Sequence, residues 1–138
     1  MSCRAGYSIF NDGTVRDWQQ RGVQWTAGKN FFRSGSFGPW IVTKDEVRDP
    51  QALDLEVRVN GEVVQHANTR EMIFPISELI AFITSFTPLE PGDVIATGTP
   101  AGIGLARTPP QFLRDGDDLQ VEIESLGLLQ NRVQNEVL

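Results

Sequence analysis

Three things are scarce in the 138-residue sequence: cysteine, histidine and positive charge. Its single cysteine, Cys3, cannot form an internal disulfide bond, which favours a reducing compartment and predicts a cytoplasmic protein. A catalytic thiol needs a histidine base, and the only histidine, His66, is far from Cys3 in sequence, so we expect Cys3 to be an idle thiol. The net charge of -6 argues against a nucleic-acid-binding surface, because such surfaces need clustered Lys and Arg.

A long apolar run is also missing. The most apolar stretch, residues 72–86, is interrupted by Pro75, Ser77 and Glu78 and is too short to span a membrane. The first residues contain no apolar segment typical of a signal peptide. We therefore expect a soluble protein whose partner is a small molecule or another protein, with no membrane contact.

Glycine and proline, by contrast, are plentiful. The 13 Gly and 8 Pro indicate many turns, and the length predicts one domain over residues 1–138. The clearest local pattern is an apolar and polar alternation over residues 53–67, interrupted by Asn60-Gly61, which predicts a β-hairpin with a two-residue type I′ turn. A regular register would pair Val57 with Val64 and Leu55 with His66, placing the histidine on the apolar face.

Further elements are predicted on both sides of this hairpin. Residues 5–10 favour a strand, and Thr14 with Asp17 matches a helix N-terminal capping pattern that predicts a helical turn through Gln20. Residues 26–40 show no periodicity and predict an irregular loop. Apolar spacing predicts a helix over residues 75–85 that packs a stripe on the sheet. A buried strand over 94–97, a glycine-rich loop over 97–104, and strands over 119–123 and 128–133 complete the expected chain.

The polar residues with the most chemical potential lie near the N-terminus. Asp12, Arg16 and Gln19 stand at i, i+4 and i+7, which would place them on one helical face, and Lys29 follows shortly after. Such a cluster can hold a metal ion, a carboxylate and a polarised carbonyl. Each residue also has an ordinary interpretation: an Asp before Gly is most often a turn residue, and Arg, Gln and Lys often lie on solvated faces.

The order of several motifs makes the functional interpretation more specific. GYSIFNDGTVRDWQ, QWTAGKNF, FGPWIVT, RVNGEVVQ, EPGDVIATGTPAGIG and DGDDLQVEIESLG follow one another along the chain. In this the sequence resembles the fumarylacetoacetate hydrolase family over essentially its whole length. The resemblance implies a β-rich α+β fold of stacked mixed β-sheets with one main amphipathic helix, a homodimer, and a divalent metal, most commonly Mg²⁺, with Mn²⁺ or Ca²⁺ as alternatives.

The resemblance also implies roles for individual residues. Asp12 matches a metal ligand, Lys29 matches the lysine that polarises the substrate carbonyl, and Arg16 and Gln19 match positions that contact the substrate. Gly98 and Thr99 match the substrate-lining TGTP motif. Metal and lysine together would stabilise the enolate of an acylpyruvate-like or other 2-oxo carboxylate during hydrolysis, tautomerisation or decarboxylation.

The sequence departs from the family pattern in its metal ligands. The family has two further metal carboxylates in a Glu-x-Glu strand that precedes the motif containing Asp12, and no such pair precedes Asp12 here. Glu56 and Glu62 lie on the downstream hairpin, and Glu122 and Glu124 are expected to face outward. The sequence therefore predicts the C-terminal part of a longer enzyme. The alternative is a non-catalytic β-rich domain that binds a small acid, or a subunit that needs a partner chain to complete its metal site.

Overall fold

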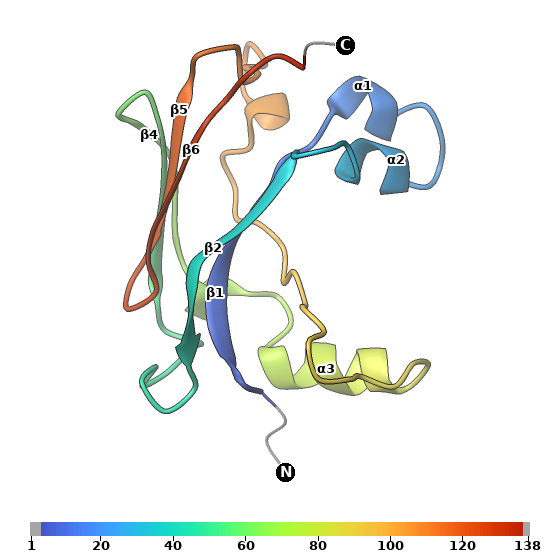
Figure 1. The fold of residues 1–138 in the computed structure, drawn as a ribbon, viewed down its shortest axis with the longest axis vertical. Coiled ribbons are helices and arrows are strands. Elements are labelled where there is room, and N and C mark those ends of the chain that lie inside the picture. The colour runs from blue at the N-terminus through green and yellow to red at the C-terminus, as the bar shows by residue number, and fades with distance from the viewer. Residues whose placement is uncertain (1–3, 137–138) are drawn as a thin grey trace.

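The computed structural model describes residues 4–136 and shows two β-sheets with helices on one side (Figure 1). Its strands are β1 (Gly6–Asp12), β2 (Gly35–Thr43), β3 (Asp54–Val59), β4 (Glu62–Asn68), β5 (Asp118–Ile123) and β6 (Gly127–Arg132). Its helices are α1 (Arg16–Gln19), α2 (Thr26–Lys29) and α3 (Ile76–Thr84), with 3-10 turns at η1 (Thr69–Glu71) and η2 (Gly104–Ala106). The predicted β-rich α+β class is confirmed.

The strands form a two-stranded sheet, β1-β2, and a four-stranded sheet in the order β4-β3-β5-β6. Every strand pairing within the described residues is antiparallel, whereas mixed sheets were expected. The predicted strands over 5–10, 119–123 and 128–133 are confirmed as β1, β5 and β6.

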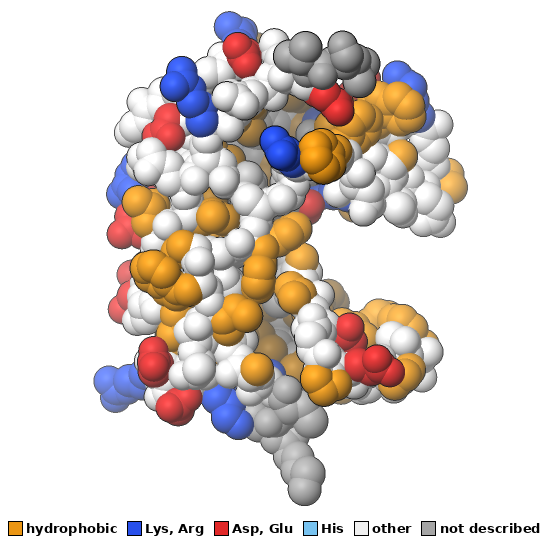
Figure 2. All heavy atoms as spheres, viewed as in Figure 1, with side chains coloured by type: hydrophobic (Ala, Val, Ile, Leu, Met, Phe, Trp, Pro, Cys, Tyr) orange, Lys and Arg blue, Asp and Glu red, His pale blue; other side chains and the backbone are white. Residues whose placement is uncertain are grey.

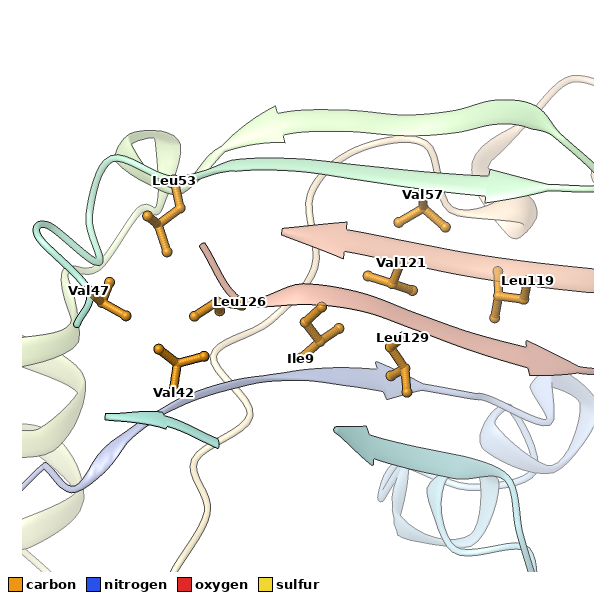
Figure 3. Close-up of a cluster of buried hydrophobic side chains, with 9 residues drawn as sticks. All are labelled: Ile9, Val42, Val47, Leu53, Val57, Leu119, Val121, Leu126 and Leu129. Atoms are coloured by element: carbon orange, nitrogen blue, oxygen red, sulfur yellow. The ribbon is translucent and has the colours of Figure 1, made fainter. Parts of the chain in front are cut away.

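The core lies between the two sheets. Figure 3 shows Ile9 of β1 and Val42 of β2 on one side of the cluster, and Val57 of β3 and Val121 of β5 on the other. Ile9 is the most completely buried of these side chains, at 1% exposed. The other buried apolar residues of the cluster are Val47, Leu53, Leu119, Leu126 and Leu129. Burying this face holds the small β1-β2 sheet in place, since a two-stranded sheet is marginally stable by itself.

The hairpin of β3 and β4 has the predicted turn. Asn60 and Gly61 have φ values of 52° and 83°, the left-handed conformations that a type I′ turn requires, and Val59 pairs with Glu62. Beyond the turn, a bulge shifts the register, so that Val57 pairs with Gln65 and Glu56 with His66. The prediction that His66 lies on the apolar face is therefore wrong.

His66 lies instead on the exposed side of the sheet. Its side chain is 68% exposed, and its Nδ1 is 3.7 Å from the Glu56 carboxylate. Glu56 is also ion-paired with Arg58, which bonds Glu122 of β5 at 3.0 Å. These charges form a cross-strand network on this side of the sheet, and Glu122 faces outward as predicted.

The expectation of an irregular loop over residues 26–40 is wrong. Residues 26–29 form α2, and residues 35–43 form β2, which pairs with β1. The strand is hard to recognise from sequence because Gly35, Gly38 and Pro39 interrupt its alternation. Its formation depends on the long-range pairing with β1.

Helix α3 is confirmed, with Pro75 at its N-cap position. In α3, all of whose residues the structure describes, no residue is fully buried, and the apolar stripe of Ile76, Leu79, Ile80 and Ile83 is half-buried, so the expected stripe is covered only in part. The predicted buried strand over 94–97 is also wrong, because these residues form no ladder and Val94 is 60% exposed. An apolar run becomes a buried strand only where a partner strand lies beside it. The expectation for Cys3 concerns a residue outside the described range.

Within residues 4–136, no helix is both long enough and apolar enough to cross a lipid bilayer.

Asp117 links the loop before β5 to the hairpin turn. Its carboxylate accepts hydrogen bonds from the Asn60 side chain at 2.8 Å and from the backbone N–H of Arg114 at 2.7 Å. These bonds, with the one from Asn60 as the larger cause, hold the pKa of Asp117 below its usual value. A carboxylate whose pKa is lower in the folded state adds stability above its unfolded pKa and loses that stability as the pH falls through its folded pKa.

We therefore expect Asp117→Asn to lower the free energy of unfolding most at neutral pH. The difference from the wild type should shrink as the pH falls below about 4, the ordinary pKa of Asp. Urea unfolding at a series of pH values measures this difference. A difference that stays constant from pH 7 to pH 2.5 would contradict it.

Candidate active site

Asp12 is the last residue of β1 and pairs with Gly35 at the start of β2. The chain is tightly packed there, because a Cβ on Gly13 would lie 1.9 Å from the Ser34 carbonyl oxygen. The side chain of Asp12 is 44% exposed. The carboxylate thus projects from the end of a paired strand, and Asp12 is not on a helical face with Arg16 and Gln19 as predicted.

The predicted helix cap is also different. Val15 occupies the N-cap position of α1 without a side-chain cap, and the Thr14 hydroxyl donates to the Asp12 carbonyl oxygen at 3.0 Å. Asp17, the other member of the expected pair, lies 3.6 Å from Arg21. Because Thr14 bonds backwards to β1, it fixes the turn that leaves the strand.

The two short helices pack closely through a buried glycine. A Cβ on Gly28 would lie 2.6 Å from the Cβ and 2.8 Å from the backbone N of Gln19, and the Gly28 carbonyl accepts from Val15 N at 2.9 Å. Only glycine permits this approach. Gly28 therefore sets the position of Lys29, the next residue and the last of α2.

Lys29 forms an ion pair with Asp12 through its Nζ and the Oδ2 of the carboxylate. The Lys29 side chain is 28% exposed. The pair therefore lies at the surface of the site, where solvent and ligands can reach it. Residues that are 17 positions apart in sequence are joined because β1 and α2 end at the same place.

Arg16 and Gln19 lie together on α1. The Nη1 of Arg16 donates to Oε1 of Gln19 at 2.8 Å, and Gln19 is only 7% exposed. A guanidinium has five N–H donors, so a contact with Gln19 orients the group and leaves it able to bind a carboxylate. The buried Gln19 thus orients the Arg16 guanidinium, and its predicted contact with a substrate is still a prediction.

Gly98 and Thr99 lie in a separate loop, which is attached to β4. The Thr99 hydroxyl accepts a hydrogen bond from the Gln65 side chain at 3.2 Å. Gly98 has a φ of 107° and open space where a Cβ would be. The structure thus brings Asp12 together with Lys29 and Arg16 together with Gln19, and it attaches Thr99 to β4 through Gln65.

Figure 2 shows a hollow between the α1-α2 pair and α3.

The described side chains do not fit a divalent metal ion on their own. In residues 4–136, no three His, Cys, Asp or Glu residues come together in a group that could hold one. Asp12 is the carboxylate of the site, and it already contacts Lys29. Mg²⁺ and Ca²⁺ require six or more oxygen ligands, so Asp12 can be only one of several.

The fold and the site define a small β-rich domain with a surface lysine–carboxylate pair and, on the neighbouring helix α1, an arginine held by a buried glutamine. The chain belongs to the fumarylacetoacetate hydrolase family: the family description "Fumarylacetoacetate (FAA) hydrolase C-terminal" matches residues 1–134. This confirms the resemblance in the sequence.

Individual relatives agree with this assignment. Oxaloacetate tautomerase Fahd2a, mitochondrial, of Rattus norvegicus is 48% identical over 134 residues, which cover 96% of this chain and 43% of the relative. The structure of a fumarylacetoacetate hydrolase from Exiguobacterium antarcticum superposes with a TM-score of 0.92 at 45% identity, covering 96% of this chain and 47% of that one.

A third relative carries ligands. Maleylpyruvate hydrolase from Sphingobium sp. SYK-6, in complex with manganese(II) and pyruvate, superposes with a TM-score of 0.80 at 36% identity, covering 94% of this chain and 44% of that one. The chain thus spans less than half the length of the relatives it matches.

Two residues that organise the site were not recognised from sequence. The only sequence signal for Gly28 is the Gly-Lys pair within the motif QWTAGKNF. The role of Gln65 depends on the loop folding back over β4, which no local pattern indicates.

Replacing Gly28 with Ala should separate α1 from α2 and lower the free energy of unfolding by about 1–3 kcal/mol, the usual cost of overpacking. Urea unfolding measures the stability, and NMR shifts of the Asp12 and Lys29 amides report the geometry of the pair. Gly22→Ala is the matched control, since a Cβ there meets nothing within 4 Å. Equal effects of the two substitutions would contradict the role of Gly28.

Proposed function

We propose that this chain supplies the lysine, arginine and one carboxylate of an enzyme site that acts on an acylpyruvate-like or other 2-oxo carboxylate. The observation that carries the proposal is the contact between Asp12 and Lys29 in a member of this family. The relatives include a tautomerase of oxaloacetate and a hydrolase bound to pyruvate, and both of these compounds are 2-oxo carboxylates.

The side chains suit the chemistry of such a substrate. When a C–C bond breaks or a proton moves next to the keto group, negative charge develops on the keto oxygen as an enolate forms. An ammonium group beside that oxygen stabilises the charge, which is the role of Lys29. The Arg16 guanidinium binds the substrate carboxylate, Gln19 orients Arg16, and the loop with Gly98 and Thr99 contacts the rest of the substrate.

Asp12 would then be one ligand of a divalent cation, Mg²⁺, Mn²⁺ or Ca²⁺, and the remaining oxygen ligands would come from outside the described residues. The chain covers 43% of one relative and 47% of another, so relatives of this family are about twice its length and have further segments that could carry such ligands. Hydrolysis, tautomerisation and decarboxylation all pass through an enolate, and the site is compatible with each. The homodimer and the cytoplasmic location are still predictions.

The second candidate is a non-catalytic small-acid-binding domain or a subunit that needs a partner chain. One observation favours it. Residues 4–136 contain no group of three His, Cys, Asp or Glu side chains that could hold a metal ion, and Asp12 is the single carboxylate of the site. In that case Lys29 and Arg16 would bind carboxylates without promoting a reaction.

Titration of the isolated chain with Mn²⁺ should show weak binding, with a Kd above about 1 mM, because one carboxylate supplies few of the ligands a dication needs. Isothermal titration calorimetry measures the affinity. Asp12→Asn, which removes the charge and keeps the size, should abolish what binding remains. Micromolar affinity in the wild-type chain would contradict the proposed division of the ligands.

In a preparation that supplies the remaining metal ligands, Lys29→Met should lower kcat for oxaloacetate tautomerisation at saturating Mn²⁺ by about 100-fold or more while KM changes little, if Lys29 stabilises the enolate. The keto–enol change is followed by ultraviolet absorbance. Lys44→Met, the same substitution in the turn after β2, is the control and should keep the wild-type rate. An equal loss in kcat and in substrate affinity would favour the carboxylate-binding alternative.

A further inference from the structure

The glycine-rich loop over residues 97–104 lies against the outer edge of β4. Among residues 4–136, β4 is the edge strand of its sheet, so one side of its backbone has no neighbouring strand there. Gly102 has a φ of 101°, and a Cβ there would lie 2.4 Å from the Val64 carbonyl oxygen. The loop therefore approaches the strand as closely as a backbone can, and it covers the edge.

Gln65 fastens the loop to the strand. Its Nε2 lies within hydrogen-bonding distance of three oxygens, Thr99 Oγ1 at 3.2 Å, Pro100 O at 2.9 Å and Ala101 O at 3.1 Å, which share the two hydrogens of the NH₂ group. Two of these acceptors are carbonyl oxygens, which cannot donate, so the amide must present its NH₂ group to the loop. The orientation of the Gln65 amide is thus fixed by its surroundings.

Arg107 holds the other end of the same loop. Its Nη2 donates to the Val64 carbonyl at 2.8 Å, and its Nε donates to the Gly102 carbonyl at 3.2 Å. The bulge in β4 lies at this point, where Arg58 pairs with Val63 and Val57 with Gln65. The bulge thus leaves Val64 between two paired residues, and the Val64 carbonyl accepts the hydrogen bond from Arg107.

We propose that Gln65 is a positioning residue that presents the Thr99 hydroxyl as a hydrogen-bond donor to the substrate. A hydroxyl that accepts from Gln65 keeps its own hydrogen for another partner. The carboxylate and keto oxygens of a 2-oxo carboxylate are acceptors only, so they match this donor. The inference rests on the proposed function for the identity of the ligand, whereas the fastening of the loop by Gln65 stands independently of it.

The surroundings of Thr99 leave space for such a ligand. Thr99 is exposed, and the neighbouring Gly98 meets nothing within 4 Å of its would-be Cβ. A fixed donor next to open space favours ligands that offer an acceptor oxygen. Gln65 therefore influences substrate affinity through Thr99 without touching the substrate.

The first experiment measures hydrogen exchange of the residue 97–104 amides in the wild-type chain. Gln65→Leu, which removes the donors, and Gln65→Glu, which replaces them with acceptors, should raise exchange at least tenfold in this loop. Gln65→Lys, a donor of similar reach, should restore protection. Gln130→Leu is the matched control, because Gln130 also donates through Nε2, to Asp118 on the far side of the sheet. Unchanged loop exchange in Gln65→Leu would overturn the positioning role.

The second experiment titrates each variant with pyruvate and follows the Thr99 amide by NMR. Gln65→Leu and Thr99→Val should each weaken binding by about three- to tenfold, the usual worth of one hydrogen bond. The double variant should be no weaker than Thr99→Val alone, since both changes remove the same bond. Additive losses of affinity would overturn the action of Gln65 through Thr99. If the wild-type chain binds no pyruvate, the proposed function is overturned. The exchange result would then still decide whether Gln65 positions the loop.

Discussion

The packing of the β1-β2 sheet against the four-stranded sheet is the contact on which the site depends. Ile9, 1% exposed, and Val42 are the buried apolar residues that β1 and β2 contribute to it. A two-stranded sheet has little stability of its own, so this apolar contact keeps β1 in place. Asp12 is the last residue of β1, and the helices α1 and α2 connect β1 to β2 along the chain. The positions of Asp12, Arg16 and Lys29 therefore depend on that packing.

Close backbone contacts then turn this scaffold into a site of defined geometry. Gly13 packs on Ser34, and Gly28 packs on Gln19, at distances that no side chain would allow. These contacts place the ends of β1 and α2 together, so that Lys29 meets Asp12. The same device recurs at Gly102, which lets the glycine-rich loop lie on β4. In both places glycine is needed for close approach, and the polar side chains next to it gain fixed positions.

The α3 side of the molecule contrasts with this ordered core. Phe82 and Phe86 are each 69% exposed, Ile73 is 88% exposed, and Val94 is 60% exposed. Figure 2 shows apolar side chains on this part of the surface. The chain spans less than half the length of its relatives. Apolar patterns that predicted buried elements here are thus covered only in part.

Local patterns in the sequence determined the elements whose stability is local. The Asn60-Gly61 turn, helix α3 and strand β5 follow from turn chemistry and hydrophobic periodicity, and the ordered motifs indicated the family and the residues to examine. Tertiary structure decided the rest. The bulge that exposes His66, the pairing that makes residues 35–43 a strand, the contact of Lys29 with Asp12 and the attachment of Thr99 to Gln65 all join residues that are distant in sequence. Such contacts depend on backbone approach and packing in three dimensions, which local periodicity does not encode.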